Sequence, residues 1–205
     1  MTPATARAST KGEETRALIL AAAVEQASAA GFESLTIGGL AERTGLSKSG
    51  LFAHFGSRLE LQMAALDEAA RRFTEQVFLP AFRAPRGLRR LEALFDAWFE
   101  WPRRARLPGG CPIDAATREY DHRPGPMREA VLDRQRHLER ELAKTVQLAI
   151  DTGELDSQTD ADEVAFALMG LILAYYRAQA TLGDAAAEKR ARAGFDRLIA
   201  QYRPR

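Results

Sequence analysis

The sequence predicts an all-α fold, on three observations. Alanine is very common and β-branched residues are sparse, a composition that favours helix over strand. Apolar residues recur at spacings of three and four over most of the chain, and no stretch has the alternation of a half-buried strand. Glycine and proline separate these periodic segments into about nine helices. The 205 residues, 46% of them hydrophobic, suffice for one large domain or two small ones.

Charge and cysteine content narrow the possible functions. The chain has 29 Lys+Arg and 28 Asp+Glu, so a net charge of +1 excludes binding to a polyanion through bulk charge alone. Cys111 is the only cysteine, which excludes an internal disulfide framework and a multi-cysteine zinc site. We see no signal peptide and no apolar run approaching the ~20 residues that span a bilayer, so we expect a cytoplasmic protein without a membrane partner.

The first helix follows a short polar segment. Residues 1–12 are small, polar and without periodicity, and we expect them to form a mobile tail. Helical periodicity begins at Glu13, with Leu18 and Ile19 followed by apolar alanines. Gly31 then supplies a left-handed residue that ends the helix.

Two short helices are expected next. Thr36 can cap a helix over residues 37–43, and Ser47 can cap another that ends near Phe55. Gly45 lies between them, where a sharp turn needs positive φ. Two short helices joined by a glycine-containing turn are a helix-turn-helix, whose second helix enters the DNA major groove.

The remaining helices follow from the same signals. Ser57 to Glu60 is a capping box that starts a long helix, which stops near Pro80. Residues 102–112 hold three prolines and two glycines and are expected to be a loop or a broken helix. The helices expected in the second half cover residues 88–101, 113–120, 126–150, 160 or 162 to 182, and 185–202.

Residues 15–61 resemble the DNA-binding domain of tetracycline-repressor (TetR) family regulators. The residues that match the family pattern are Gly31-Phe32, Thr36, Leu40-Ala41, Gly45-Leu46-Ser47, Leu51-Phe52, His54-Phe55, Arg58 and Leu61. Three positions depart from that pattern: Phe52 replaces a tyrosine, Arg58 replaces a lysine, and Ala27 stands where a large aromatic residue is common. In addition, Gly38 and Gly39 lie inside the first short helix and cost about 0.8–1 kcal/mol each relative to alanine.

The resemblance implies which residues meet DNA. It implies phosphate contacts for Thr36, Ser47, His54 and Arg58, and Phe52 stands at another contact position. Lys48, Ser49 and Gly50 are candidates to face the groove, because they fall at the start and on the outer face of the second short helix. The free N–H groups of that helix terminus also favour a phosphate.

The second half is expected to form a homodimer. The helix from Glu163 to Leu182 is apolar nearly all round, so it needs burial on two sides. One side of this helix can face the core of the monomer and the other side a second copy of the chain. The alternative is that both sides are buried in the core of a monomer. The residues expected at this interface are Phe166, Gly170, Ile172, Leu173, Tyr176, Phe195, Leu198 and Ile199.

Aromatic residues around the predicted break suggest a pocket for a mainly apolar small molecule, with ordinary core packing as the alternative. The expected lining residues are Trp98, Phe99, Trp101, Tyr120, Leu138, Phe166 and Met169. Cys111 is expected to be a small buried hydrophobe, and a thiol sensor is the alternative. The acidic residues near His122 have no recognised metal spacing, so we expect neither a metal nor a cofactor.

Together these features predict a tail (1–12), a helix-turn-helix DNA-binding domain (13–60), which is an N-terminal three-helix bundle, and a helical ligand-binding and dimerisation domain (61–205). The resemblance implies a one-component transcriptional regulator, most simply a repressor. It would bind palindromic operator DNA as a homodimer and be released by a small molecule. An architectural DNA-binding protein without a ligand and a helical enzyme are the alternatives. The enzyme has no support from a glycine-rich phosphate loop or a nucleophile elbow.

Overall fold

The first helix begins two residues earlier than the periodicity predicts. In the computed structural model, which describes residues 10–204, α1 spans Lys11–Ala30. The Thr10 hydroxyl accepts from the Glu13 amide at 3.3 Å, and the Glu13 carboxylate accepts from the Thr10 amide at 2.6 Å. This capping box adds Lys11 and Gly12 to the helix. The rest of the predicted tail, residues 1–9, lies outside the described residues.

The helix-turn-helix forms where the capping residues predict it. A 3₁₀ turn, η1 (Phe32–Ser34), leads into α2 (Ile37–Thr44), and α3 (Lys48–Phe55) follows. The Thr36 hydroxyl accepts from the Gly39 amide, and the Ser47 hydroxyl from the Gly50 amide, both at 3.0 Å. Gly45 ends α2 at φ 69°, in the left-handed region that a side chain disfavours. Local hydrogen bonding therefore defines both helix starts.

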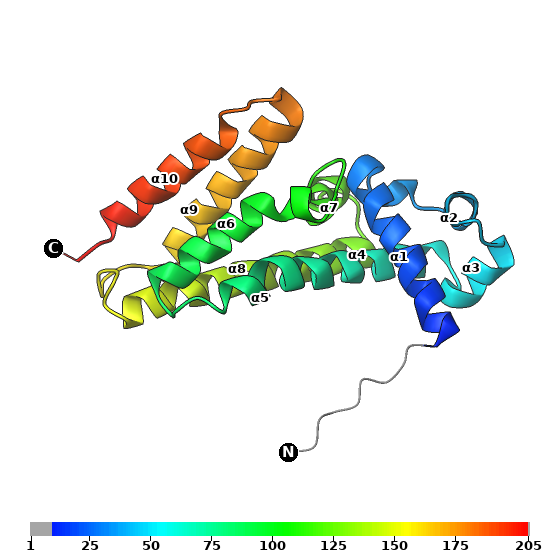
Figure 1. Ribbon diagram of the computed structural model, residues 1–205, viewed down its shortest axis with the longest axis horizontal. Coiled ribbons are helices and arrows are strands. Elements are labelled where there is room, and N and C mark those ends of the chain that lie inside the picture. Colours follow the sequence, from blue (N-terminus) through cyan, green and yellow to red (C-terminus); the bar gives the residue numbers. More distant parts are fainter. Residues whose placement is uncertain (1–9, 205) are drawn as a thin grey trace, which may run out of the picture.

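A long rod follows. Helix α4 (Arg58–Phe73) begins with the Ser57 hydroxyl accepting from the Glu60 amide at 3.1 Å. It continues through a π-helical turn, η2 (Thr74–Phe78), into the short α5 (Leu79–Ala81), as the position of Pro80 predicts. The rod extends from the helix-turn-helix along most of the molecule (Figure 1).

The second half consists of five further helices joined by loops. No strand occurs between residues 10 and 204. Helix α6 continues through Pro102, so the predicted break begins only at Ala105. A proline in the last turn removes one hydrogen bond close to where the helix ends. The five helices are α6 (Leu88–Arg104), α7 (Pro112–Tyr120), α8 (Pro126–Asp151), α9 (Ala161–Tyr176) with its π-helical extension η3 (Arg177–Thr181), and α10 (Ala187–Gln201).

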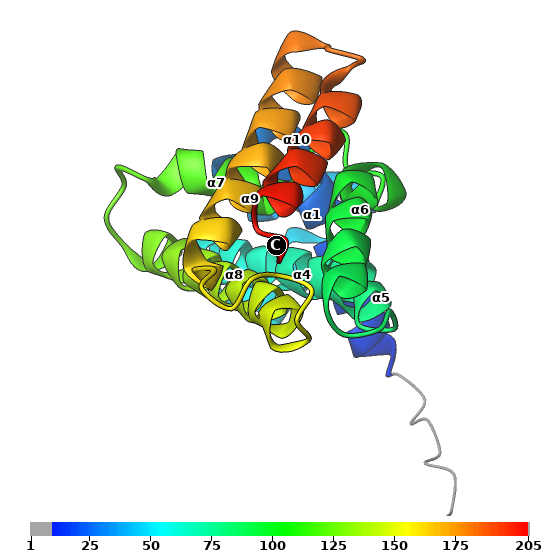
Figure 2. The same ribbon diagram turned by 90° about the vertical axis from the view of Figure 1, so that its left-hand side faces the viewer.

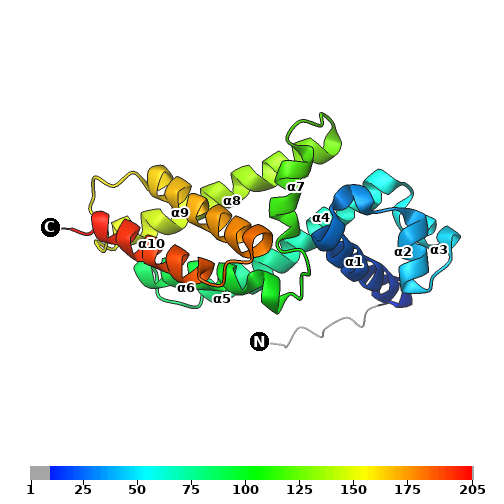
Figure 3. The ribbon, with the colours of Figure 1, turned by 90° about the horizontal axis from the view of Figure 1, so that it is seen from above.

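The elements form an elongated molecule with a head and a body. Helices α1, α2 and α3 form the head at one end, and α4 and α8 run along the long axis (Figure 1). Helices α9 and α10 pair along the upper edge of the body, with α6 to one side and α4 and α8 below them in the view from the body end (Figure 2). Helix α7 stands between body and head (Figure 3).

Two hydrophobic cores correspond to the head and the body. The head core contains Ile19, Phe32, Leu40 and Leu51, and it also takes in residues of α4, α7 and the start of α8. The body core joins the end of α4 to α6, α8, α9 and α10. Packing therefore continues through α4 rather than stopping at residue 60, and the boundary drawn there stays a prediction.

Helix α9 and η3 form one apolar helix over Ala161–Thr181, 21 residues long. The expectation that no apolar run approaches a membrane-spanning length is therefore wrong, because length and composition alone would let this helix cross a bilayer. Core helices of globular proteins share this property. Here α9 packs against both α8 and α10.

Helix α7 is fastened to the head by hydrogen bonds. The Glu119 carboxylate accepts from the backbone amides of Phe32 at 2.8 Å and Glu33 at 2.7 Å. The Tyr120 hydroxyl donates to the Glu33 carboxylate at 2.8 Å. These bonds satisfy the free amides that follow α1 and fix the head against the body.

We expect Glu119→Ala to lower the free energy of unfolding by about 1–3 kcal/mol, because two partly buried amides lose their acceptor. Urea unfolding followed by circular dichroism measures this change. Glu139→Ala, on an exposed position of α8, is the matched control and should change stability little. Equal stability of the two variants would contradict the capping role of Glu119.

Candidate functional site

The outer face of α3 is polar and accessible. Leu51 and Phe55 are buried and anchor the helix to the head core. Ser47, Lys48 and Ser49 are exposed at its N-terminus. The Ser47 hydroxyl lies 3.2 Å from that of Ser49 while it also caps the helix. The helix therefore presents small hydrogen-bonding side chains, one cation and its positive dipole end on one surface.

The Lys48 side chain lies beside Gly38 of α2. A Cβ at Gly38 would lie 3.4 Å from Cε and 3.8 Å from Nζ of Lys48, which is ordinary van der Waals contact. This contact places the Lys48 side chain next to α2 without requiring a glycine there. Among the ion pairs of residues 10–204, none involves Lys48, so its charge is available to a ligand.

Four other predicted contacts lie on α3 or close to it. Phe52 is 57% exposed, an unusual position for a large aromatic ring, and it projects from the same helix as Lys48. His54 is half-buried beside Phe55, with ring centroids 6.2 Å apart. Thr36 is exposed, but its hydroxyl already caps α2. Gly50 is half-buried, consistent with close approach of backbone rather than a side-chain contact.

Arg58 is held by the protein itself. Its Nε donates to the Leu35 carbonyl at 2.9 Å, and its guanidinium pairs with the Glu33 carboxylate at 3.0 Å. The same group also donates to the Glu33 carbonyl. Arg58 therefore holds the turn before α2, a structural role that the sequence did not predict. Its contact with phosphate stays a prediction.

The residues predicted for the dimer interface divide into two groups. Ile172, Tyr176, Phe195 and Ile199 are at most 7% exposed and belong to the body core of the same chain. Leu198 also packs against this core. Folding of one chain already buries the first four, so they offer little surface to a second copy, whereas Leu198 is only half-buried and stays a predicted interface residue. The other three predicted interface residues are exposed and define the outer stripe of α9: Phe166, Gly170 and Leu173.

The predicted aromatic pocket is filled by its own side chains. Trp98, Phe99 and Trp101 are at most 3% exposed, and Phe73 packs edge-on against both tryptophans, at centroid distances of 5.1 and 5.6 Å. Tyr120 belongs to the head core instead.

Three further lining residues were predicted. Phe166 is 83% exposed and faces away from this core. Leu138 and Met169 border, with Trp98, a cavity of only about 30 Å³, far below the ~300–1,000 Å³ of sites for drug-sized molecules. Phe99 borders a separate hollow of about 410 Å³ beside the α6–α7 loop, which none of the other predicted lining residues reaches. The seven predicted residues therefore do not line one common pocket.

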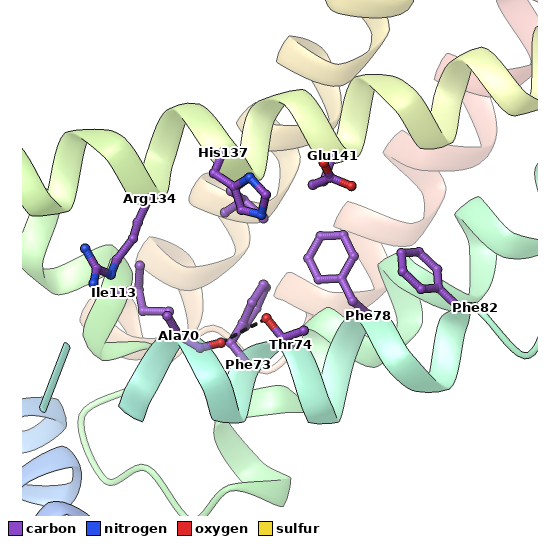
Figure 4. Close-up of a pocket in the computed structure, with 10 residues that line it drawn as sticks. Ala70, Phe73, Thr74, Phe78, Phe82, Ile113, Arg134, His137 and Glu141 are labelled. Carbon is purple, nitrogen blue, oxygen red and sulfur yellow. Dashed lines mark hydrogen bonds between the residues drawn. The ribbon is translucent and has the colours of Figure 1, made fainter. Parts of the chain in front are cut away.

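A larger apolar cleft lies between the α4–α5 rod and α8. Its volume is about 260 Å³. On the rod side the cleft is lined by Phe73, Phe78 and Phe82. On the α8 side its polar lining residues are Arg134, His137 and Glu141 (Figure 4). Leu138 is the only predicted lining residue it shares. The cleft is lined by Ala70, Phe73, Thr74, Phe78, Phe82, Ile113, Arg134, His137, Leu138 and Glu141.

The sequence signal for this cleft was Phe73, Phe78 and Phe82, which stand close together around the end of the rod. Phe82 remains 43% exposed, and the ring of Phe78 lies 5.8 Å from it. Arg134 is fixed at the cleft by donating to Asp67 and to the Ala130 carbonyl. Which aromatic residues line a cleft and which fill a core depends on how the helices cross, so spacing alone did not distinguish them.

Cys111 and the acidic residues show no metal chemistry in the described region. Between residues 10 and 204, no group of three His, Cys, Asp or Glu side chains could hold a metal ion. Cys111 is 8% exposed, and burial raises the pKa of its thiol. At neutral pH the thiol is therefore protonated and weakly nucleophilic.

Comparison with protein families agrees with this arrangement in both halves of the chain. Residues 19–65 match the family described as "Bacterial regulatory proteins, tetR family", and residues 87–195 match "Tetracyclin repressor-like, C-terminal domain". No curated protein matches the chain. A helix-turn-helix head on an all-helical body, matched over these ranges, defines a bacterial transcriptional regulator. The chain belongs to the TetR family.

Solved structures share the whole fold. A TetR transcriptional regulator from Chloroflexus aurantiacus is 26% identical with a TM-score of 0.81, and the alignment covers 93% of this chain and 94% of that one. A TetR-family regulator from Cytophaga hutchinsonii is 19% identical with a TM-score of 0.82, covering 97% and 100%. AibR, solved in complex with isovaleryl coenzyme A and operator DNA, is 20% identical with a TM-score of 0.67, covering 92% and 97%.

We expect Lys48→Ala to weaken DNA binding without changing the melting temperature, because Lys48 is exposed. If Lys48 contacts a phosphate, the slope of log affinity against log salt should fall by about one. Fluorescence anisotropy with operator DNA measures both quantities. Lys189→Ala, an exposed lysine of α10, is the control. Unchanged affinity and salt slope would exclude Lys48 from the interface.

Arg58→Ala should behave differently. Because Arg58 holds Glu33 and Leu35, its loss should lower the melting temperature by several degrees as well as weaken DNA binding. Thermal unfolding by circular dichroism is the measurement. A variant with the wild-type melting temperature would show that these bonds contribute little to the head.

Proposed function

We propose that this protein is a ligand-responsive transcriptional repressor that binds palindromic operator DNA as a homodimer and releases it when a mainly apolar small molecule binds. One observation carries the proposal. The rod that begins directly after the recognition helix α3 also forms one wall of the apolar cleft. The DNA-contacting surface and the cleft are thus joined by a single continuous element.

The recognition face supports binding to DNA as a pair. Helix α3 has only eight residues and can read few base pairs. Two copies related by a dyad would read two half-sites of a palindrome about 34–36 Å apart. The net charge of +1 requires the affinity to come from locally placed groups such as Lys48, which is exposed at the start of α3.

The outer stripe of α9 supports the homodimer. Phe166 is 83% and Leu173 43% exposed, and Gly170 lies between them on the same helical face. A glycine at the centre of an apolar stripe allows a second helix to approach closely. A second copy placed on this stripe would bury the remaining apolar face of α9, which a single chain leaves in water.

The cleft supports a mainly apolar ligand. Its rod-side wall consists of phenylalanine rings with Ala70 and Thr74, while Arg134, His137 and Glu141 supply polar groups from α8 (Figure 4). A hydrophobic lining with few polar groups is the usual composition of a small-molecule site. AibR, a protein of the same fold, binds isovaleryl coenzyme A and operator DNA, which supports a combination of both partners here.

Ligand binding would act through the rod. A molecule wedged between the rod and α8 stabilises the arrangement that accommodates it, and α4 carries any tilt to α3. Release follows if that arrangement holds the two recognition helices at a spacing unsuited to adjacent major grooves. The regulator would act in the cytoplasm, as a DNA-binding protein, and without a cofactor.

The cleft disfavours an architectural protein without a ligand. An enzyme is disfavoured by the lack of any phosphate loop or nucleophile elbow in the sequence. Repression rather than activation rests on the family alone.

We expect Leu173→Asp to give a folded monomer that no longer binds a palindrome, because the charge falls on the outer stripe of α9. Ile172→Asp is the matched contrast on the neighbouring residue. Ile172 is 1% exposed, so a charge there costs several kcal/mol and unfolds the body. Light scattering and circular dichroism distinguish the two results. A folded dimer from Leu173→Asp would place the interface elsewhere.

We expect Ala70→Phe to fill the cleft and abolish binding of 1-anilinonaphthalene-8-sulfonate, an apolar fluorescent probe, while DNA affinity stays near wild type. Ala70 is half-buried at the wall of the cleft, so the larger ring can enter it. Trp98→Ala is the contrast, because it opens the solid core and costs about 3–5 kcal/mol. Full probe binding by a folded Ala70→Phe variant would exclude this cleft as the ligand site.

A further inference from the structure

The recognition helix α3 carries a large apolar side chain in water. Phe52 is 57% exposed, whereas Leu51 and Phe55 of the same helix are buried in the head core. The ring of Phe52 takes part in none of the aromatic or cation–π contacts found among residues 10–204. Helix α3 lies at the outer end of the head, away from the body (Figure 1). Folding of one chain therefore leaves more than half of this side chain uncovered.

Phe52 shares the outer face of α3 with the residues expected at the groove. It follows Lys48 by four positions and Ser49 by three, spacings that make side chains neighbours on a helix. Lys48, Ser49 and Ala53 are exposed as well. Because Ser49 and Ala53 have short side chains, Phe52 is the largest apolar group on this face. When α3 enters a major groove with this face inward, the ring of Phe52 enters with it.

The chemistry of the ring decides what it can contact in the groove. A phenyl ring has no hydrogen-bond donor or acceptor, so it adds affinity only where it buries apolar surface. Base pairs present hydrogen-bonding groups in the major groove, together with one apolar group, the 5-methyl of thymine. A phenyl ring against this methyl group removes two apolar surfaces from water. Against the amino group of cytosine it would instead cover a donor without giving it a partner.

We propose that Phe52 is a specificity-determining residue that selects thymine at one position of each half-site through contact with the 5-methyl group. The inference rests on the proposed function, because it requires α3 in the major groove of operator DNA. Phe52 stands where the family pattern has a tyrosine, and without the hydroxyl it cannot donate a hydrogen bond to a phosphate. In a homodimer the dyad repeats the contact, so the preference for thymine acts twice on each operator.

The first test uses the wild-type, full-length protein and depends on no variant. Duplexes that bind are selected from a randomised palindromic library, and each thymine is then replaced by deoxyuridine in both half-sites at once. This replacement removes the 5-methyl group and keeps every hydrogen-bonding group of the base pair. At one position we expect about 15-fold weaker binding by fluorescence anisotropy, about fourfold for each of the two buried methyl groups. A selected site without thymine, or unchanged affinity at every thymine, overturns the proposal.

The variant Phe52→Ala tests whether this residue makes the methyl contact. It should bind the selected site more weakly than the wild type, and it should bind the thymine and deoxyuridine duplexes equally. Its melting temperature should stay near wild type, because the side chain is largely exposed. Leu79→Ala, which removes an exposed apolar side chain from α5, is the matched control and should keep both the affinity and the preference for thymine. A preference that persists in Phe52→Ala overturns the assignment.

The same measurements separate this inference from the proposed function. If Phe52→Ala weakens binding to every duplex alike and deoxyuridine has no effect on the wild type, the ring packs on the backbone sugars. That result overturns the thymine contact, while operator binding stands because a selected site is still bound. If the library yields no bound duplex, operator binding is overturned, and the contact of Phe52 with thymine is overturned with it.

Discussion

The architecture depends on the burial of α4 in two hydrophobic cores at once. Leu61, Ala65 and Leu66 are fully buried in the head, and Ala69 and Phe73 begin the body core within the next two turns. A helix whose two ends belong to different cores cannot move in one without disturbing the other. Because this helix starts directly after α3 and continues along the apolar cleft, the head and the body are mechanically linked by packing rather than by a flexible linker.

A second linkage supports the first on the other side of the head. Helix α7 and the loop before it dock on the end of α1, through Glu119 at the amides of Phe32 and Glu33 and through Gly109 at Ser28. The two linkages differ in chemistry. Burial of apolar side chains along α4 is insensitive to direction, whereas the hydrogen bonds of α7 need particular geometry. A small displacement of α7 would therefore break discrete bonds.

Each of two pockets lies against one of these linkages. The apolar cleft borders α4, and it also touches α7 at Ile113. A second pocket borders the α6–α7 loop and α7. The body thus has an apolar cleft and a more polar pocket, each in contact with an element that reaches the DNA-binding head.

The outer stripe of α9 shows why composition alone gave an ambiguous result. The sequence required burial on two sides, and the structure supplies one side, through α8 and α10. Phe166 and Leu173 keep the other side in water, while Ile172 and Tyr176 are buried by the same chain. The sequence of an apolar helix indicates how much of its surface must be buried. The rotation of the helix about its axis, which tertiary packing sets, decides which residues a neighbouring helix covers.

The sequence by itself determined the all-helical fold and the helix-turn-helix, because those depend on local chemistry. Thr36 and Ser47 cap the helices that follow them, and Gly45 has the positive φ of a tight turn, whatever the rest of the chain does. The roles of Arg58, of the aromatic cluster and of Phe73, Phe78 and Phe82 were decided only by the tertiary structure. Arg58 is exposed by its position on α4, yet a turn 23 residues earlier brings the Leu35 carbonyl to its guanidinium. Trp98 and Trp101 fill a core and Phe82 borders a cleft because of the angles at which helices cross, and hydrophobic spacing along one helix contains no information about its partners.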